Sequence, residues 1–171
     1  MEKVFVIGAT KKLQNEIDKP IQDVEAYKEV PEIHQWHANL VTFNRRKCLI
    51  LVNNATGLNL TLFGLRKPQF DHLDTVIKGS LKQLFQLLEI DESVGEEMLR
   101  AADEIVYTKT KNRRVIGIMN DLKSTMEHQI QGQAYEDIDA QKINEENNKM
   151  PFRPLEHTYP YKTFIKYFQN Q

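Results

Sequence analysis

Apolar and polar positions alternate most regularly between residues 36 and 63, where three runs have the pattern of β-strands. The runs are Trp36–Phe43, Cys48–Asn53 and Leu58–Phe63, and only the short stretches "NRRK" and "NATG" separate them. Connections of this length favour an antiparallel meander. We centre the first turn on Arg45–Arg46 and the second on Ala55–Thr56, which sets a trial register for the three strands.

In this register the two faces of the meander differ in polarity. The face predicted to be core holds Trp36, Ala38, Leu40, Thr42, Leu49, Leu51, Leu58, Leu60 and Leu62. The other face is mixed, with polar residues near His37 and apolar residues near Phe43. Because successive side chains of a strand point to opposite faces, a one-residue slip of the pairing would exchange the two sets.

Helical periodicity dominates much of the chain between residues 67 and 130. Apolar residues recur every three or four positions in three segments, which we predict to be helices: 67–88, 91–102 and 112–130. Two further runs are predicted to be strands: 3–9, which is rich in β-branched residues, and 104–110, which alternates. Residues 18–35 contain two prolines and many acids, so they are expected to form a connection.

These elements predict an α+β fold. We expect an antiparallel sheet, formed by the meander and one or two further strands, with three helices packed against one face. Residues 1–130 would form this core domain. Residues 131–150 are polar and weakly periodic, which is typical of a linker or a marginal helix. Residues 151–168 hold six aromatic side chains, so the C-terminal arm is expected to dock on the core or on a partner chain.

The composition is that of an ordinary soluble domain. The chain has 171 residues and a net charge of −1, which gives no support to bulk binding of nucleic acid or anionic membranes. The single cysteine, Cys48, excludes an internal disulfide and lies in an apolar run, so we expect it to be buried. The N-terminus lacks the pattern of a signal peptide, and no run is long enough to span a membrane. We therefore predict a cytoplasmic protein without a membrane partner.

Lysines and arginines gather at the junctions between predicted elements. Eleven of the 23 cations lie in four short stretches: Lys11–Lys12, Arg45–Lys47, Arg66–Lys67 and Lys109–Arg114. Two interpretations stay open, because charged turns are favourable in water and because arginine forks and helix starts suit phosphate or carboxylate groups. Cations just after Thr10 and at Arg113–Arg114 would oppose the helix dipole, which favours a bound anion or an acidic partner.

His37 is the one histidine with polar neighbours on the same predicted face, namely Asn39, Asn54 and Asn59. This group is either a structural hydrogen-bonding network or part of a site. His34 and His37 would face opposite ways if His37 is in a strand, which disfavours shared metal ligation. With one cysteine and five scattered histidines, we predict no metal site and no cofactor.

The segments "ATKKL" (9–13), "WHANLVTFNRRKCLILVN" (36–53) and "YTKTKNRR" (107–114) resemble an uncharacterised bacterial family. Its members begin with a strand and C-T-K-K-L, continue with W-x-A-N-L, a basic turn and an L-V-N strand, and are related to a domain of plasmid-encoded open-reading-frame proteins. Ala9 stands in place of the family's cysteine, so no role for that cysteine is carried over. The resemblance covers about residues 3–130 and implies a bacterial origin but no activity.

Three hypotheses of function follow. The first is a non-enzymatic module that binds an anionic ligand, a nucleic acid or an acidic protein through its basic turns. The second is an enzyme acting on a phosphorylated or carboxylated small molecule, with His37 as acid/base; a deep pocket holding His37 with cations would favour it. The third is a protein–protein module or homodimer that uses the aromatic arm. The candidate ligand-binding residues are Lys11, Lys12, His37, Asn39, Arg45, Arg46, Lys109, Lys111, Arg113 and Arg114.

Overall fold

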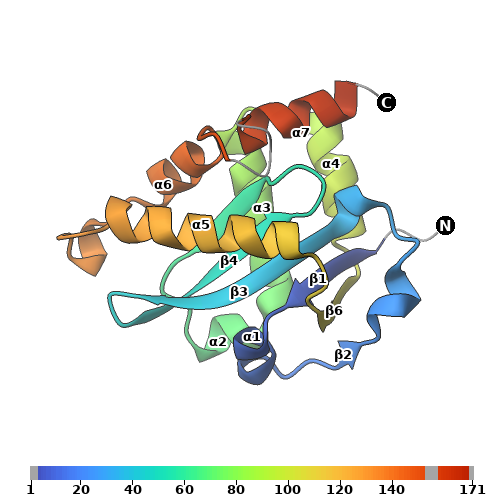
Figure 1. Cartoon of the computed structure of the whole chain (residues 1–171), viewed down its shortest axis with the longest axis horizontal. Coiled ribbons are helices and arrows are strands. Elements are labelled where there is room, and N and C mark those ends of the chain that lie inside the picture. The colour runs from blue at the N-terminus through green and yellow to red at the C-terminus, as the bar shows by residue number, and fades with distance from the viewer. Residues whose placement is uncertain (1–3, 153–157, 170–171) are drawn as a thin grey trace.

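A six-stranded mixed sheet forms the centre of the molecule in the computed structural model, which describes residues 4–152 and 158–169 (Figure 1). The strands lie in the order β2-β6-β1-β3-β4-β5. Their bounds are β1 Phe5–Ala9, β2 Ile21–Gln22, β3 Gln35–Phe43, β4 Arg46–Asn53, β5 Asn59–Leu62 and β6 Ile105–Lys109. The fold is α+β, as predicted.

The predicted meander is confirmed, since β3, β4 and β5 pair antiparallel. The second turn lies where the sequence predicts it, because Leu51 faces Leu60. The first turn is one residue earlier, on Asn44 and Arg45, whose φ angles are 50° and 64°. Two positive φ angles are what a two-residue hairpin loop requires, and asparagine tolerates that conformation. Moving the turn by one position shifts the partners by two residues, so both predicted faces are retained.

The other half of the sheet is parallel, which the sequence pattern did not predict. β1 runs parallel to β3 and β6, and β2 runs parallel to β6. Each parallel pair needs a long crossover. Residues 10–34 supply one, through α1 (Lys11–Glu16), β2 and two 3-10 turns, η1 (Val24–Tyr27) and η2 (Glu32–His34). Alternation alone identifies strands but not their partners, so an antiparallel sheet was expected throughout.

Helices cover both faces of the sheet, and the prediction of three helices against one face is wrong. The face of Trp36 and Leu51 packs under α1, α3 (Leu73–Leu87), α4 (Glu92–Ala101) and α7 (Pro160–Gln169). The opposite face packs under α5 (Arg113–Gln129) and α6 (Ala140–Asn147). That second face carries the apolar run Val41, Phe43, Cys48, Ile50 and Val52, which needs its own cover.

The predicted helices are found within a few residues of their expected bounds. The segment 67–88 is divided into α2 (Lys67–Asp71) and α3 by His72, whose φ and ψ of −122° and 37° are not helical. Cys48 is buried, as predicted. None of the described helices is both long enough and apolar enough to cross a membrane.

The polar segment after residue 130 is held by asparagine side chains as well as by apolar residues such as Ile143. It forms a 3-10 turn, η3 (Tyr135–Asp137), and the helix α6. Asn144 accepts from the Thr61 N–H at 2.7 Å and donates to the Thr61 carbonyl at 3.0 Å. Asn148 does the same for Asn59 at 2.9 and 2.8 Å. The two amides thus replace a neighbouring strand at the β5 edge, which protects that edge from other chains.

The described part of the C-terminal segment contributes to both apolar layers. Phe152 is buried with the α5 cluster and Phe164 with the α3 cluster, where its ring lies 6.2 Å from that of Phe85. The division at residue 130 into a core domain and an arm stays a prediction. Residues 153–157 of the predicted arm lie outside the described residues.

Candidate ligand-binding site

His37 is buried in the middle of the sheet and joins three parts of the chain. It lies in β3 next to Gly8 of β1, and its Nδ1 is 2.9 Å from Oδ1 of Asn54, just after β4. Its Nε2 accepts from the backbone N–H groups of Lys111 and Asn112, at 3.1 and 3.3 Å. The imidazole therefore fixes the loop between β6 and α5 to the centre of the sheet.

These contacts define the protonation state of His37. A nitrogen that accepts from two N–H groups carries no hydrogen, so the proton of the neutral ring is on Nδ1 and is donated to Asn54. Burial lowers the pKa of His37, and the bond to Asn54 opposes that shift only in part. A second proton on Nε2 would face the two N–H donors. Both ring nitrogens are thus occupied by the fold itself.

Gly8 makes room for this ring. A methyl group on Gly8 would lie 2.9 Å from Nε2 of His37, which is closer than such atoms approach. The glycine in "IGAT" thus has a packing function, because only a residue without Cβ lets the imidazole lie flat on β1.

A cavity of about 750 Å³ opens beside the hydrogen-bonded side chain of His37, over β1 and β6. α5 packs over β3 and β4, and the cavity occupies the neighbouring part of the same face. Gly8, Thr108 and His37 contribute to its floor, and η1 forms one of its walls. The sheet is open here because residues 10–34 cover β1 and β6 with short turns instead of a long helix.

Cations dominate the charged residues around the cavity. Its lining includes one carboxylate, Glu32, and five lysines or arginines: Lys28, Lys109, Lys111, Arg113 and Arg114. Arg113 and Arg114 open α5, whose first turn has no acidic residue. Their charge adds to the positive end of the helix dipole, an arrangement that destabilises an empty site and stabilises a bound anion.

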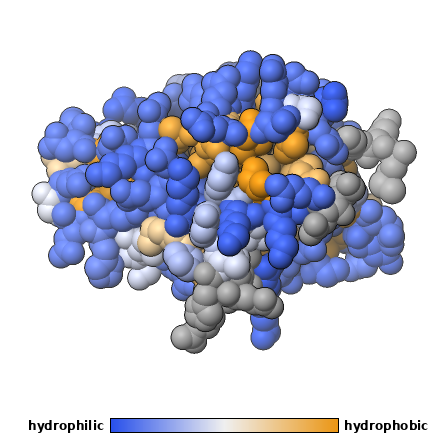
Figure 2. All heavy atoms as spheres, turned by 90° about the horizontal axis from the view of Figure 1, so that it is seen from above, coloured by the Kyte–Doolittle hydropathy of each residue, from blue (hydrophilic) through white to orange (hydrophobic). Residues whose placement is uncertain are grey.

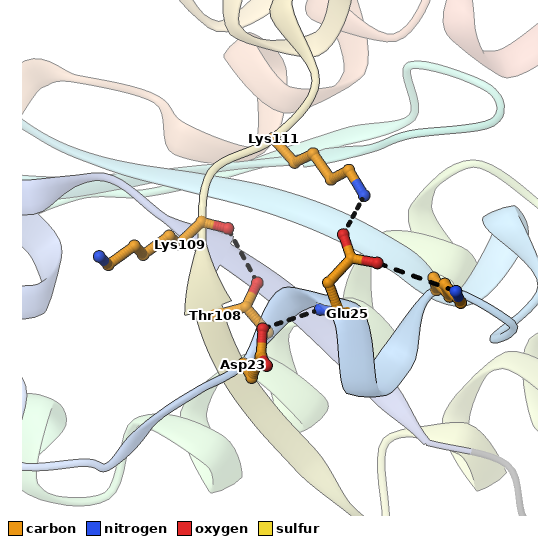
Figure 3. Close-up of polar contacts among 6 residues, drawn as sticks. Asp23, Glu25, Thr108, Lys109 and Lys111 are labelled. Carbon is orange, nitrogen blue, oxygen red and sulfur yellow. Dashed lines mark hydrogen bonds and ion pairs between the residues drawn. The ribbon is translucent and has the colours of Figure 1, made fainter.

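An ion pair joins η1 to Lys111, one of the residues that line the cavity (Figure 3). Nζ of Lys111 lies 3.1 Å from Oε1 of Glu25 in η1, and Nζ of Lys28 lies 3.9 Å from the other oxygen of the same carboxylate. Asp23 holds Glu25 in place by accepting from its N–H at 3.1 Å. Glu25 and Lys111 are each about 60% exposed, at 63% and 60%, so an anionic ligand can compete with this carboxylate for Lys111.

Comparison with known families assigns the chain to one of them. The model of one family, described as Domain of unknown function (DUF6933), matches residues 6–163. The chain belongs to this family. No curated protein and no solved structure gives a significant match. The DUF6933 match begins in β1 and ends in α7, so it includes every residue that lines the cavity.

The cavity of this DUF6933 domain brings together five of the ten candidate residues: His37, Lys109, Lys111, Arg113 and Arg114. Their contributions differ. The side chain of Lys109, the last residue of β6, points away from that of Lys111, which lies beyond the end of the strand (Figure 3). Lys109 is also the acceptor for the Thr108 hydroxyl through its carbonyl, at 2.9 Å.

The other five candidates lie elsewhere. Arg45 and Arg46 are at the tip of the β3–β4 hairpin, six strand residues beyond His37, which is about 20 Å along an extended strand. The guanidinium of Arg46 stacks on Tyr135, 4.4 Å from the ring centre. Lys11 and Lys12 are exposed at the start of α1. Asn39 accepts from the Thr10 hydroxyl at 2.8 Å, so the predicted group of asparagines around His37 is divided.

Sequence reasoning did not select several residues that shape the site. Tyr27, Lys28 and Glu25 come from the stretch 18–35, which showed no periodicity and was expected to be a connection. Asn54 was noted as a neighbour of His37 but was not included among the candidates. A signal was present for Gly8, because a lone glycine in a strand marks a place where another part of the chain approaches closely. Among the described residues no group of three metal-ligating side chains comes together.

Proposed function

We propose that this bacterial cytoplasmic protein is a non-enzymatic module that binds a small anionic ligand in the cavity between η1 and the start of α5. The observation that carries the proposal is the accumulation of five cations and one carboxylate around a concave space that also holds the N-terminus of a long helix. We also propose that the family is related to a domain of plasmid-encoded open-reading-frame proteins.

Concavity favours a small ligand over a nucleic acid. A duplex or a single strand is usually bound along an extended basic surface that follows the phosphate backbone. Here Arg45 and Arg46 point from a different end of the hairpin, so the basic turns do not form one continuous surface with the α5 loop.

A titration with pyrophosphate at low ionic strength tests the proposal. The cavity variant combines Lys111→Gln with Arg113→Gln, and the matched control combines Arg45→Gln with Arg46→Gln. Both variants lose two positive charges, so a non-specific effect of net charge is equal in the two. We expect the cavity variant to lose affinity by about tenfold or more, since each charge-assisted hydrogen bond contributes about 1.5–3 kcal/mol. The control should bind within about twofold of the parent protein, because a remote charge is largely screened.

Two results would overturn the proposal. One is an equal loss of affinity in both variants, which would indicate general electrostatic attraction. The other is an absence of salt-sensitive binding in the parent protein. A parallel titration with a short single-stranded oligonucleotide separates small-anion binding from nucleic-acid binding, because only the latter should depend on Arg45 and Arg46.

An enzyme with His37 as acid/base is the second candidate, because His37 borders a cavity that also holds cations. Its Nε2 would first have to lose the N–H groups of Lys111 and Asn112, which burial makes costly. Phosphatase and esterase assays with the His37→Gln variant test this candidate. Turnover that disappears in the variant while pyrophosphate binding persists would favour the enzyme.

The third candidate, an interaction module, draws on α7. Ile165, Tyr167 and Phe168 are only partly buried against the core. Figure 2 views the molecule from above Figure 1, the side where α7 lies, and shows an apolar area surrounded by hydrophilic side chains. Sedimentation of the parent protein and of an Ile165→Lys, Phe168→Lys variant would test it, since self-association through this area should be lost in the variant.

A further inference from the structure

The cavity has two chemically different sides. Lys111, Arg113 and Arg114 form a cationic side at the start of α5. From η1 and the turn after it, the apolar side chains of Val24, Tyr27 and Val30 line the space, beside the one cation Lys28. A ligand that carried charge alone would leave this second side in contact with water. The separation of the two sides therefore indicates a ligand that has an anionic end and an apolar or aromatic end.

Tyr27 is the aromatic residue that η1 contributes to the cavity. Its side chain is half-buried, and within the described residues neither its ring nor its hydroxyl has a partner. The other described tyrosine of comparable burial in a 3-10 turn, Tyr135, has its ring stacked under Arg46 and its hydroxyl packed against Gly64. A half-buried aromatic ring that stacks on no other ring or cation of the described residues is a suitable surface for a planar group of a ligand.

The dimensions agree with a ligand of two parts. A volume of about 750 Å³ lies within the range of roughly 300–1,000 Å³ that is typical of small-molecule and cofactor pockets. A single phosphate would occupy only the α5 end of such a space. Thr108 and Gln35 add polar groups to the lining of the same cavity.

We infer that the ligand is a planar ring joined to a phosphate or carboxylate, with the anion against Arg113 and Arg114 and the ring against Tyr27. This inference rests on the proposed function and deepens it, because it assigns a chemical class to the anion. A nucleoside monophosphate and an aryl carboxylate share this chemistry, and the experiment below distinguishes between them.

Four probes are titrated into the full chain: adenosine monophosphate, inorganic phosphate, adenosine and 2-naphthoate. We expect at least one of the two ring-bearing anions to bind about tenfold or more tightly than inorganic phosphate, because stacking on an aromatic side chain adds to the ionic contacts. Adenosine without the phosphate should bind weakly. Binding of 2-naphthoate without binding of adenosine monophosphate would support the ring-and-anion chemistry with a carboxylate as the anion.

Variants at Tyr27 identify the surface that holds the ring. Tyr27→Leu should reduce the affinity for the ring-bearing anion by about tenfold and leave phosphate binding unchanged, whereas Tyr27→Phe should retain most of it. Tyr161→Leu is the matched control, because Tyr161 lies in α7 and not in the cavity. Melting curves of each variant confirm that it is folded, and Tyr27→Phe keeps the test valid if Tyr27→Leu is unstable.

The outcomes separate this inference from the proposed function. Equal affinity for phosphate and for both ring-bearing anions overturns the inference and leaves the proposed function intact. If adenosine binds as tightly as adenosine monophosphate, the anion has no role in binding, which overturns both the inference and the proposed function. A lack of binding by all four probes at low ionic strength overturns both statements.

Discussion

The two ends of the β3–β4 hairpin both carry or adjoin basic residues, but they differ in how those residues are held. At the tip, Asn44–Arg46 form a turn whose cations are exposed or stacked on one tyrosine. At the other end, His37 and Asn54 are buried and hold the loop that carries Lys111 and Arg113. Cations at the first end lie on a turn outside the core, whereas the backbone that carries those at the second end is held by hydrogen bonds to a buried side chain. A binding site requires cations on a fixed backbone, because an anion can then contact several of them at the same time.

The largest difference between the two ends should appear in stability. His37→Ala removes the acceptor for two partly buried N–H groups and leaves the buried Oδ1 of Asn54 without its donor. We expect a loss of about 2–4 kcal/mol in the free energy of unfolding. Polar groups left without a hydrogen-bond partner destabilise the folded state, and so does the empty space left by the imidazole ring. Urea denaturation measures it. The control Arg45→Ala should change stability by less than about 0.5 kcal/mol, and equal losses in the two variants would remove the distinction.

The face assignment of this hairpin could be predicted from the sequence, because alternation determines which side chains share a face. Leu49, Leu51 and Leu60 are buried under α3 as expected. Leu40 and Leu62 are only partly buried, and Thr42 is exposed, since these residues approach the tip of the hairpin. Local pattern thus predicts the identity of a face but not how far its cover extends.

The candidate site was harder to predict, because it depends on contacts between distant segments. The bonds between His37 and Lys111–Asn112 join residues more than 70 positions apart, with a separation of 74 for Lys111. The parallel pairing of β1 with β3 and β6 brings these segments together, and no local signal specifies that pairing. Arg45 and Arg46 were selected by charge alone, a property that also suits a solvated turn.

Gly8 and Gly79 offer a test of how tightly the His37 end is packed. A methyl group on Gly8 would meet His37, whereas one on Gly79, in the exposed part of α3, would meet nothing within 4 Å. Gly8→Ala should lower the free energy of unfolding by about 1–3 kcal/mol, as overpacking does. Gly79→Ala should raise it by about 0.5–1 kcal/mol, because alanine is the better helix former. Chemical denaturation of both variants checks the signs, and a neutral Gly8→Ala would show that the ring can move.

The pH dependence of stability should distinguish His37 from the exposed histidines. The pKa of His37 in the folded protein is lowered, so between that value and about 6.5 the unfolded chain binds more protons than the folded one. Its contribution to stability is therefore complete above about pH 6.5 and decreases as the pH falls, with a slope of at most about 1.4 kcal/mol per pH unit.

Denaturation curves between pH 7.5 and 5 measure this slope. The His37→Gln variant is the reference, because glutamine offers an acceptor and a donor but does not titrate. Subtracting its curve from that of the parent protein removes the contribution of all other groups. Parallel curves for the two proteins would contradict a role of His37 as a buried neutral acceptor.

The smallest expected effect lies at the tip and has the opposite sign. Arg45 has a φ of 64°, a conformation that side chains with a Cβ adopt at a cost, and no ion pair is found for it among the described residues. Arg45→Gly places the preferred asparagine–glycine pair in a two-residue hairpin loop and should raise the free energy of unfolding by about 0.5–1 kcal/mol. Urea denaturation measures the gain, and pyrophosphate titration should show unchanged affinity, because the tip lies far from the cavity. A loss of affinity in this variant would mean that Arg45 contributes to ligand binding after all, and the two ends of the hairpin would then act on the same anion.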